Sequence, residues 1–133
     1  MFLTKQHHIA IICSDYAKAK EFYIDKLGFE LYREVYRPAQ DDYLRMLRQG
    51  DTVLELFIRP DAPARVNNPE AMGLRHLAFH VEDIEPAVAW LNSLGIETET
   101  IRTDKVILSS RITLYGLIHI HIAILPEIYR RRI

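Results

Sequence analysis

The sequence predicts an α+β fold in which two tandem β-α-β-β-β modules form a curved mixed sheet, a half-barrel with the helices outside. One observation behind this prediction is a repeat: residues 8–11 read His-Ile-Ala-Ile, and residues 76–79, 68 positions later, read His-Leu-Ala-Phe. Each copy is followed by one helix-like stretch and then by three strand-like runs, which indicates one supersecondary unit present twice. Strand-rich modules with one helix each are typical of an α+β architecture.

The first module is expected over about residues 5–58. Residues 7–13 are mostly apolar and β-branched, which is typical of a buried strand. Asp15 supplies N-cap chemistry for a helix that runs to about Leu27, where Gly28 fits a C-terminal stop. Three further strands are expected near residues 29–37, 43–49 and 52–58.

The second module is expected over about residues 74–126, after a linker over about 59–73 that is rich in proline and asparagine. Its first strand is expected over residues 74–81, and Asp83 is expected to cap a helix that ends near Leu94. Three further strands are expected near residues 96–102, 106–114 and 117–125.

The composition favours one domain over residues 1–133, because 49% of its residues are hydrophobic and can bury a core. The formal net charge of −1 argues against partners attracted by bulk electrostatics, such as nucleic acid or an anionic membrane. The single cysteine, Cys13, cannot form an intrachain disulfide, and no segment resembles a signal peptide or a membrane span. We therefore expect a cytoplasmic protein that acts on a small molecule.

Three residues are candidates for a metal site. His8 and His76 occupy equivalent places in the two copies, and Glu55 lies within an otherwise apolar strand, where an unpaired carboxylate is costly. Two imidazoles and one carboxylate suit Zn²⁺, Ni²⁺, Mn²⁺, Co²⁺ or Fe²⁺. The alternative for the histidines is a hydrogen-bonded place in the core. The alternative for the carboxylate is a salt bridge to one of three arginines, Arg37, Arg48 and Arg75.

Four runs are distinctive in combination: His7-His8-Ile9-Ala10-Ile11, Phe22-Tyr23 with Leu27-Gly28-Phe29, Val53-Leu54-Glu55-Leu56-Phe57, and Gly73-Leu74-Arg75-His76-Leu77-Ala78-Phe79. Together they resemble the vicinal oxygen chelate superfamily, and within it small bacterial proteins related to lactoylglutathione lyase (glyoxalase I). The resemblance covers about residues 5–104 and implies paired β-α-β-β-β modules. It also implies a divalent metal ion held by His, Glu, His and Glu, the first three of which correspond to His8, Glu55 and His76.

The fourth ligand is where the chain departs from this family, because the family's run like Asp-Pro-Asp-Gly followed by Leu-Glu is absent. The repeat provides an independent estimate. The first histidine and the glutamate are 47 residues apart, and the same offset in the second module ends at Ala123, which cannot bind a metal. Glu127 and, as an alternative, His121 have the same strand parity, and His119 is in phase but further away.

The resemblance implies a lyase or isomerase of glyoxalase type, in which a metal ion acts as a Lewis acid on two vicinal oxygens of the substrate. Glu55 is the candidate base, and Arg37 is a candidate to hold a substrate carboxylate through its forked donors. Alternatives on the same scaffold are a ring-cleaving dioxygenase, a thiol transferase, and a metal-free protein that binds small molecules, as in drug resistance. A homodimer is expected, since modules of this kind can pair within one chain or across two.

Overall fold

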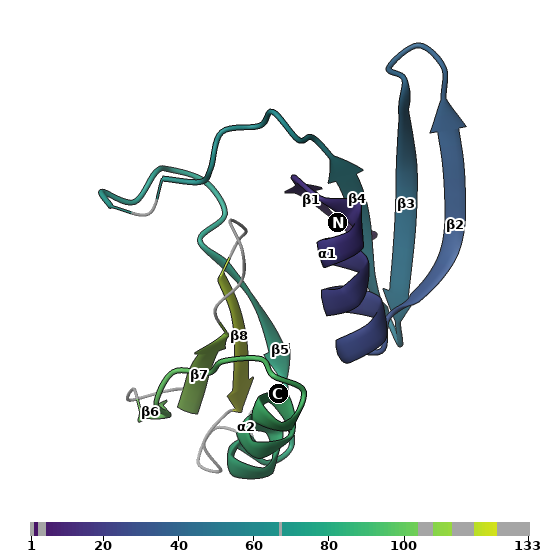
Figure 1. The fold of residues 1–133 in the computed structure, drawn as a ribbon. Coiled ribbons are helices and arrows are strands. Elements are labelled where there is room, and N and C mark those ends of the chain that lie inside the picture. Colours follow the sequence, from purple (N-terminus) through teal and green to yellow (C-terminus); the bar gives the residue numbers. More distant parts are fainter. Residues whose placement is uncertain (1, 3–4, 67, 104–107, 113–118, 125–133) are drawn as a thin grey trace. The chain divides into compact units, whose positions relative to one another are not determined.

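The computed structural model describes residues 2, 5–66, 68–103, 108–112 and 119–124 (Figure 1). The chain divides into two compact units, Met1–Ala64 and Arg65–Ile133, each with its own sheet. The division falls inside the segment in which the sequence predicts a linker. Among the described residues, no helix is long and apolar enough to span a membrane.

The first unit is a β-α-β-β-β module with a four-stranded sheet in the order β1-β4-β3-β2 (Figure 1). Strand β1 runs parallel to β4, whereas β3 is antiparallel to both β4 and β2. Its elements are β1 (Ile9–Cys13), α1 (Tyr16–Lys20), η1 (Glu21–Lys26), β2 (Glu30–Arg37), β3 (Asp42–Gln49) and β4 (Thr52–Ile58). The strand and helix positions predicted for this module are confirmed to within about two residues.

The helix of the first unit begins at an N-cap and changes its winding halfway. The Asp15 carboxylate accepts a hydrogen bond of 3.2 Å from the Lys18 backbone N–H, which satisfies an otherwise unpaired donor of the first turn. After Lys20 the helix winds as a π-helix, and the Leu27 N–H donates to the Phe22 carbonyl five residues earlier, at 3.0 Å. The helix then ends as predicted at Gly28, whose φ of +77° suits a residue without Cβ.

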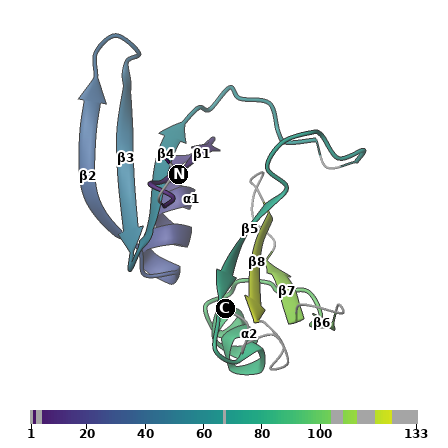
Figure 2. The ribbon, with the colours of Figure 1, turned by 180° about the vertical axis from the view of Figure 1, so that it is seen from behind.

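The helix covers one face of the sheet, and this fixes which side chains are left on the other face (Figures 1 and 2). The side chains between the helix and the sheet are buried. The strands contribute Ile11, Cys13, Leu47, Leu54 and Leu56, and the helix contributes Ala19 and Tyr23. Because side chains alternate along a strand, the residues between them point the other way. We call that second side the open face; it carries Ala10, Glu55 and Phe57, which the register places on neighbouring positions.

The second unit repeats the module with its sheet in the order β5-β8-β7-β6, and β5 runs parallel to β8 (Figure 2). Helix α2 packs against β7 and β8, burying Ile84 and Leu91. As predicted, Asp83 caps this helix, its carboxylate accepting from the Glu85 N–H at 3.3 Å. The elements are β5 (His76–His80), α2 (Ile84–Ser93), β6 (Arg102–Thr103), β7 (Leu108–Ile112) and β8 (His119–Ile124).

The prediction is wrong for one strand of the second unit. The strand expected over 96–102 begins only at Arg102, as β6. Within 96–102 the single buried apolar side chain is Ile96, which is 4% exposed, and Glu97 and Thr100 point into solvent. The segment therefore lacks the apolar face that would dock it on the core, and only its end joins the sheet through β7. The α+β class and the duplicated β-α-β-β-β topology are confirmed.

Candidate metal centre

The first unit brings His8 and Glu55 together on its open face. His8 immediately precedes β1, and the parallel register pairs Ala10 of this strand with Glu55 of β4. The His8 Nε2 atom lies 3.3 Å from the Glu55 Oε2 atom. The Glu55 side chain is 13% exposed and the His8 side chain 37% exposed, so this donor pair is accessible from solvent. Two residues that are 47 positions apart are thus adjacent because β1 and β4 are neighbours.

A neighbouring histidine contacts the other side of the His8 ring. The Nδ1 atoms of His7 and His8 are 2.8 Å apart, so one ring donates a hydrogen bond to the other. The two rings meet edge to face, with centroids 5.1 Å apart. His8 is therefore held through Nδ1 while Nε2 points to the carboxylate, the arrangement by which an outer partner orients a metal-binding imidazole.

The arginines considered as partners for Glu55 bind elsewhere. Arg37 forms an ion pair with Asp42, Arg75 pairs with Glu70, and the Arg48 guanidinium lies over the Tyr32 ring at 5.3 Å. The ion pair recorded for Glu55 among the described residues is the one with His8. This arrangement disfavours the salt-bridge alternative and leaves the carboxylate facing an imidazole.

The second unit places His76 beside His121. The register of β5 and β8 pairs Ala78 with His121, and the rings of His76 and His121 are stacked with centroids 4.3 Å apart. Since Ala10 pairs with Glu55 in the first unit, His121 occupies the position equivalent to Glu55.

The offset counted along the sequence is therefore wrong for the second unit. Ala123, where that count ends, pairs with His80, and the equivalent of the glutamate lies two residues earlier. The second repeat is shorter by two residues between its first and last strands, so counting overshoots. Glu127 lies outside the described residues.

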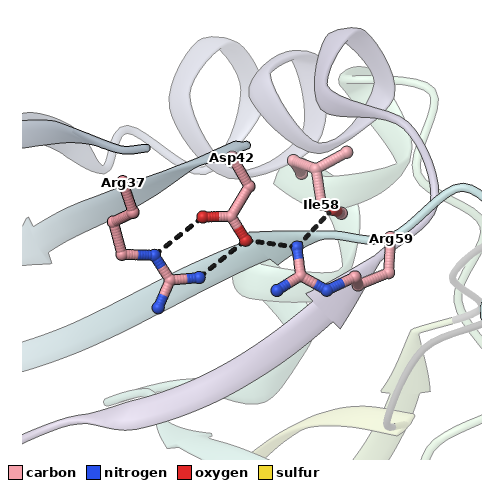
Figure 3. Close-up of polar contacts among 4 residues, drawn as sticks. All are labelled: Arg37, Asp42, Ile58 and Arg59. Carbon is pink, nitrogen blue, oxygen red and sulfur yellow. Dashed lines mark hydrogen bonds and ion pairs between the residues drawn. The ribbon is translucent and has the colours of Figure 1, made fainter. Parts of the chain in front are cut away.

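Arg37 belongs to a network that the sequence only partly indicates (Figure 3). Its Nε and Nη2 atoms donate to the two Asp42 oxygens at 2.7 and 2.6 Å, and Arg59 Nη1 contacts Asp42 Oδ2 at 2.5 Å. Arg37 first, and then Arg59, lower the pKa of the Asp42 carboxyl, which keeps it ionised at neutral pH. Sequence reasoning missed Asp42 and Arg59, although Arg59 has the strand parity of Glu55 and Phe57.

The donor chemistry fits a divalent cation of the Zn²⁺, Ni²⁺, Mn²⁺, Co²⁺ or Fe²⁺ type. An imidazole nitrogen and a carboxylate oxygen converge in the first unit, and two imidazoles lie together in the second. In neither unit do three or more His, Cys, Asp or Glu side chains of the described residues gather in one metal-binding group. Among the described residues of each unit, these donors therefore make up only part of a complete coordination sphere.

Residues 5–114 match the Glyoxalase/Bleomycin resistance protein/Dioxygenase superfamily. The chain is 54% identical over 105 residues to the uncharacterized protein YwkD of Bacillus subtilis, which covers 78% of the chain and 82% of that protein. It is also 54% identical over 103 residues to the uncharacterized protein YaeR of Escherichia coli, covering 77% and 80%. A more distant relative is the 2-epi-5-epi-valiolone epimerase of an Actinomyces species, 31% identical over 104 residues that cover 65% of the chain and 57% of that enzyme.

The fold is similar to that of a crystallised glyoxalase family protein from Enterococcus faecalis. The two structures superpose with a TM-score of 0.87 at 43% sequence identity, covering 93% of this chain and all of the other.

Proposed function

Because this chain belongs to the Glyoxalase/Bleomycin resistance protein/Dioxygenase superfamily, we propose that it is a divalent-metal-dependent lyase or isomerase of glyoxalase type. Its substrate would be a small molecule with two vicinal oxygens. The observation that carries this proposal is the equivalent pairing in the two units, His8 beside Glu55 and His76 beside His121. A protein that only sequesters a ligand needs no such set of donors.

In this proposal His8, Glu55 and His76 hold the metal ion, and His121 or Glu127 supplies the fourth ligand. The bound cation contributes Lewis acidity toward the substrate oxygens. Glu55 acts as the general base: its carboxylate accepts a proton from the carbon next to a carbonyl and returns it to the neighbouring position. His7 keeps the His8 ring oriented through the contact between their Nδ1 atoms. The epimerase named among the relatives supports chemistry of this broad class.

The proposal extends to location and assembly. Cys13 is buried and 2% exposed, so it does not offer a thiol for an intermolecular disulfide, and we propose a cytoplasmic protein. We also propose a homodimer, in which modules of two chains pair and a second copy supplies the donors that one module lacks. Sedimentation of the purified protein measures its oligomeric state directly.

Elemental analysis of the full chain tests the metal site. We expect about one equivalent of divalent metal per chain, and a loss of most of it in His8→Ala and in His76→Ala. The matched control is His80→Ala, which removes an exposed histidine four residues further along the same strand and should leave the metal content unchanged. Metal-free wild-type protein, or equal metal content in all variants, would contradict the proposal.

Activity assays then separate the reactions. Isomerisation of methylglyoxal–thiol adducts, with exchange of the proton next to the carbonyl, is expected for the wild type and is expected to be lost in Glu55→Gln. Oxygen uptake with catechols in the absence of isomerisation would instead identify a ring-cleaving dioxygenase. Ligand binding without turnover by a metal-free protein would identify a binding module.

A further inference from the structure

A second group of charged side chains lies on the open face, one aromatic ring away from Glu55. It consists of Arg37 at the end of β2, Asp42 at the start of β3 and Arg59 just after β4 (Figure 3). Asp42 is the shared partner: it accepts two hydrogen bonds from Arg37 and an ion pair from Arg59. Arg59 Nη1 also donates to the Ile58 carbonyl at 3.1 Å. We call Arg37, Asp42 and Arg59 the arginine pair and its carboxylate.

This group carries one positive charge in excess. The two guanidinium groups are positive at any physiological pH, whereas the shared carboxylate supplies a single negative charge. The Asp42 side chain is only 9% exposed, while those of Arg37 and Arg59 are 28% and 40% exposed. The anion of the group is thus covered and its cations face solvent, so the group presents a net positive surface.

The hydrogen bonds leave a guanidinium edge available. Within the described part of this unit, the polar contacts of Arg59 engage Nη1 alone, so its Nε and Nη2 donors form an unused fork. Arg37 uses Nε and Nη2 on Asp42 and keeps Nη1. A planar fork of two N–H donors is the geometry that binds a carboxylate or a phosphate through two parallel hydrogen bonds.

Phe57 links this group to the metal-binding candidates. The guanidinium carbons of Arg37 and Arg59 lie 4.9 and 5.9 Å from the centre of the Phe57 ring, so the ring supports both cations. Phe57 is two residues beyond Glu55 on the same face of β4, a step of about 6.6 Å. The Glu55 carboxylate is near enough to contribute, after Asp42, to the raised pKa of Arg37.

We propose that Arg37 and Arg59 form a subsite for an oxyanion, a carboxylate or a phosphate, on the ligand of this protein. The uncharged middle of the ligand passes beside Phe57, and its vicinal oxygens lie at His8 and Glu55. The position of those oxygens rests on the proposed function, whereas the oxyanion subsite requires only residues of the first unit. The substrate class is then a small vicinal-oxygen compound with one anionic group about one ring length from its reactive carbons. Asp42 serves as a positioning residue that holds both guanidinium groups against the ring.

Binding of simple anions by the full chain tests the subsite. The protein is titrated in EDTA at constant ionic strength, with inorganic phosphate in one arm and propionate in the other, while NMR follows the arginine Nε–Hε signals. We expect saturable shifts of the Arg59 and Arg37 signals, and the tighter of the two anions identifies the anionic group. Arg59→Gln should weaken binding about tenfold or more, since it removes a charged fork. Arg59→Lys should weaken it less, because it keeps the charge.

The matched control is Arg45→Gln. Arg45 also pairs with a carboxylate, Glu34, at 2.5 Å, but its guanidinium lies over Tyr16 of α1, on the helix side of the same sheet. This variant changes the net charge equally and should bind the anions as the wild type does. Shifts that never saturate, or equal affinities in Arg59→Gln and Arg45→Gln, would overturn the subsite.

The two proposals can fail separately. His8→Ala should lose metal yet keep anion binding, because EDTA already removes any metal from the titration. If anion binding is present but metal is absent from the purified protein, the subsite stands and the lyase proposal falls. If the purified protein binds metal but shows no saturable anion binding, the subsite falls and the lyase proposal stands. Thermal melting of each variant confirms that a lost signal is not a lost fold, and Arg59→Lys replaces Arg59→Gln if the latter unfolds.

Discussion

Leu54 lies on the opposite face of β4 from Glu55, and shortening its side chain should destabilise the first unit without changing the donor residues. Its side chain is fully buried and points to the helix side of β4, opposite Leu47, while its neighbour Glu55 points to the open face. Leu54→Ala removes three buried carbon groups, worth about 2.4 kcal/mol at about 0.8 kcal/mol each. The cavity that remains adds to this, so we expect unfolding to become easier by about 3 kcal/mol.

Urea unfolding followed by circular dichroism measures this loss. With a slope of about 2 kcal/mol per M, the midpoint should fall by about 1.5 M. The control is Ile12→Ala on the open face, where a side chain that is 57% exposed should contribute less than about 1 kcal/mol. Equal shifts for the two variants would refute the assignment of faces, and with it the argument that places Glu55 outside the core.

Two further predictions concern titratable groups. The lowered pKa of Asp42, caused by Arg37 and then by Arg59, means that the carboxylate stabilises the fold above about pH 3.9 and loses this effect as pH falls through the lowered value. Asp42→Asn should therefore flatten the acid limb of the stability-against-pH curve, and an unchanged limb would contradict the ion pairs. Burial raises the pKa of the Cys13 thiol from 9.0 to about 11, which lowers its thiolate fraction at pH 8 about 100-fold. A thiol reagent should label Cys13 slowly in native protein and quickly in urea; fast native labelling would show that β1 is not packed as described.

Strand parity was sufficient to assign faces in the first unit. Glu55 is the one charged residue of an otherwise apolar strand and His8 stands at the edge of another, and in the structure both lie on the face that alternates with the buried positions. The alternation of side chains is a local property of an extended backbone and does not depend on the rest of the chain. The same holds for Asp15 and Gly28, whose roles at the helix ends come from their own chemistry.

Counting residues along the repeat failed to locate the equivalent of Glu55 in the second unit, because the two copies differ in length. The offset between the copies falls from 68 for His8 and His76 to 67 for Gly28 and Gly95, which shows one missing residue, but no motif marks the second, so the repeat offset ended at Ala123 instead of His121. Only pairing between strands sets a register, because the backbone hydrogen bonds join residues regardless of their separation in sequence. The strand expected over 96–102 failed for a related reason: a polar segment joins a sheet only where tertiary contacts bury one of its faces.

The sequence by itself determined the duplicated module and the class of fold, and it singled out His8, Glu55 and His76 as candidate donors, because periodicity and residue chemistry are properties of short segments. Tertiary structure alone decided which residues are neighbours: His121 stands where Glu55 stands in the other unit, and Arg59 meets Asp42 although they are 17 positions apart. Antiparallel pairing of β3 with β4 brings the start of one strand to the end of the other, which local patterns do not encode. The repeat that first drew attention to two histidines thus leads to two equivalent positions with different chemistry, a carboxylate at Glu55 in the first unit and an imidazole at His121 in the second.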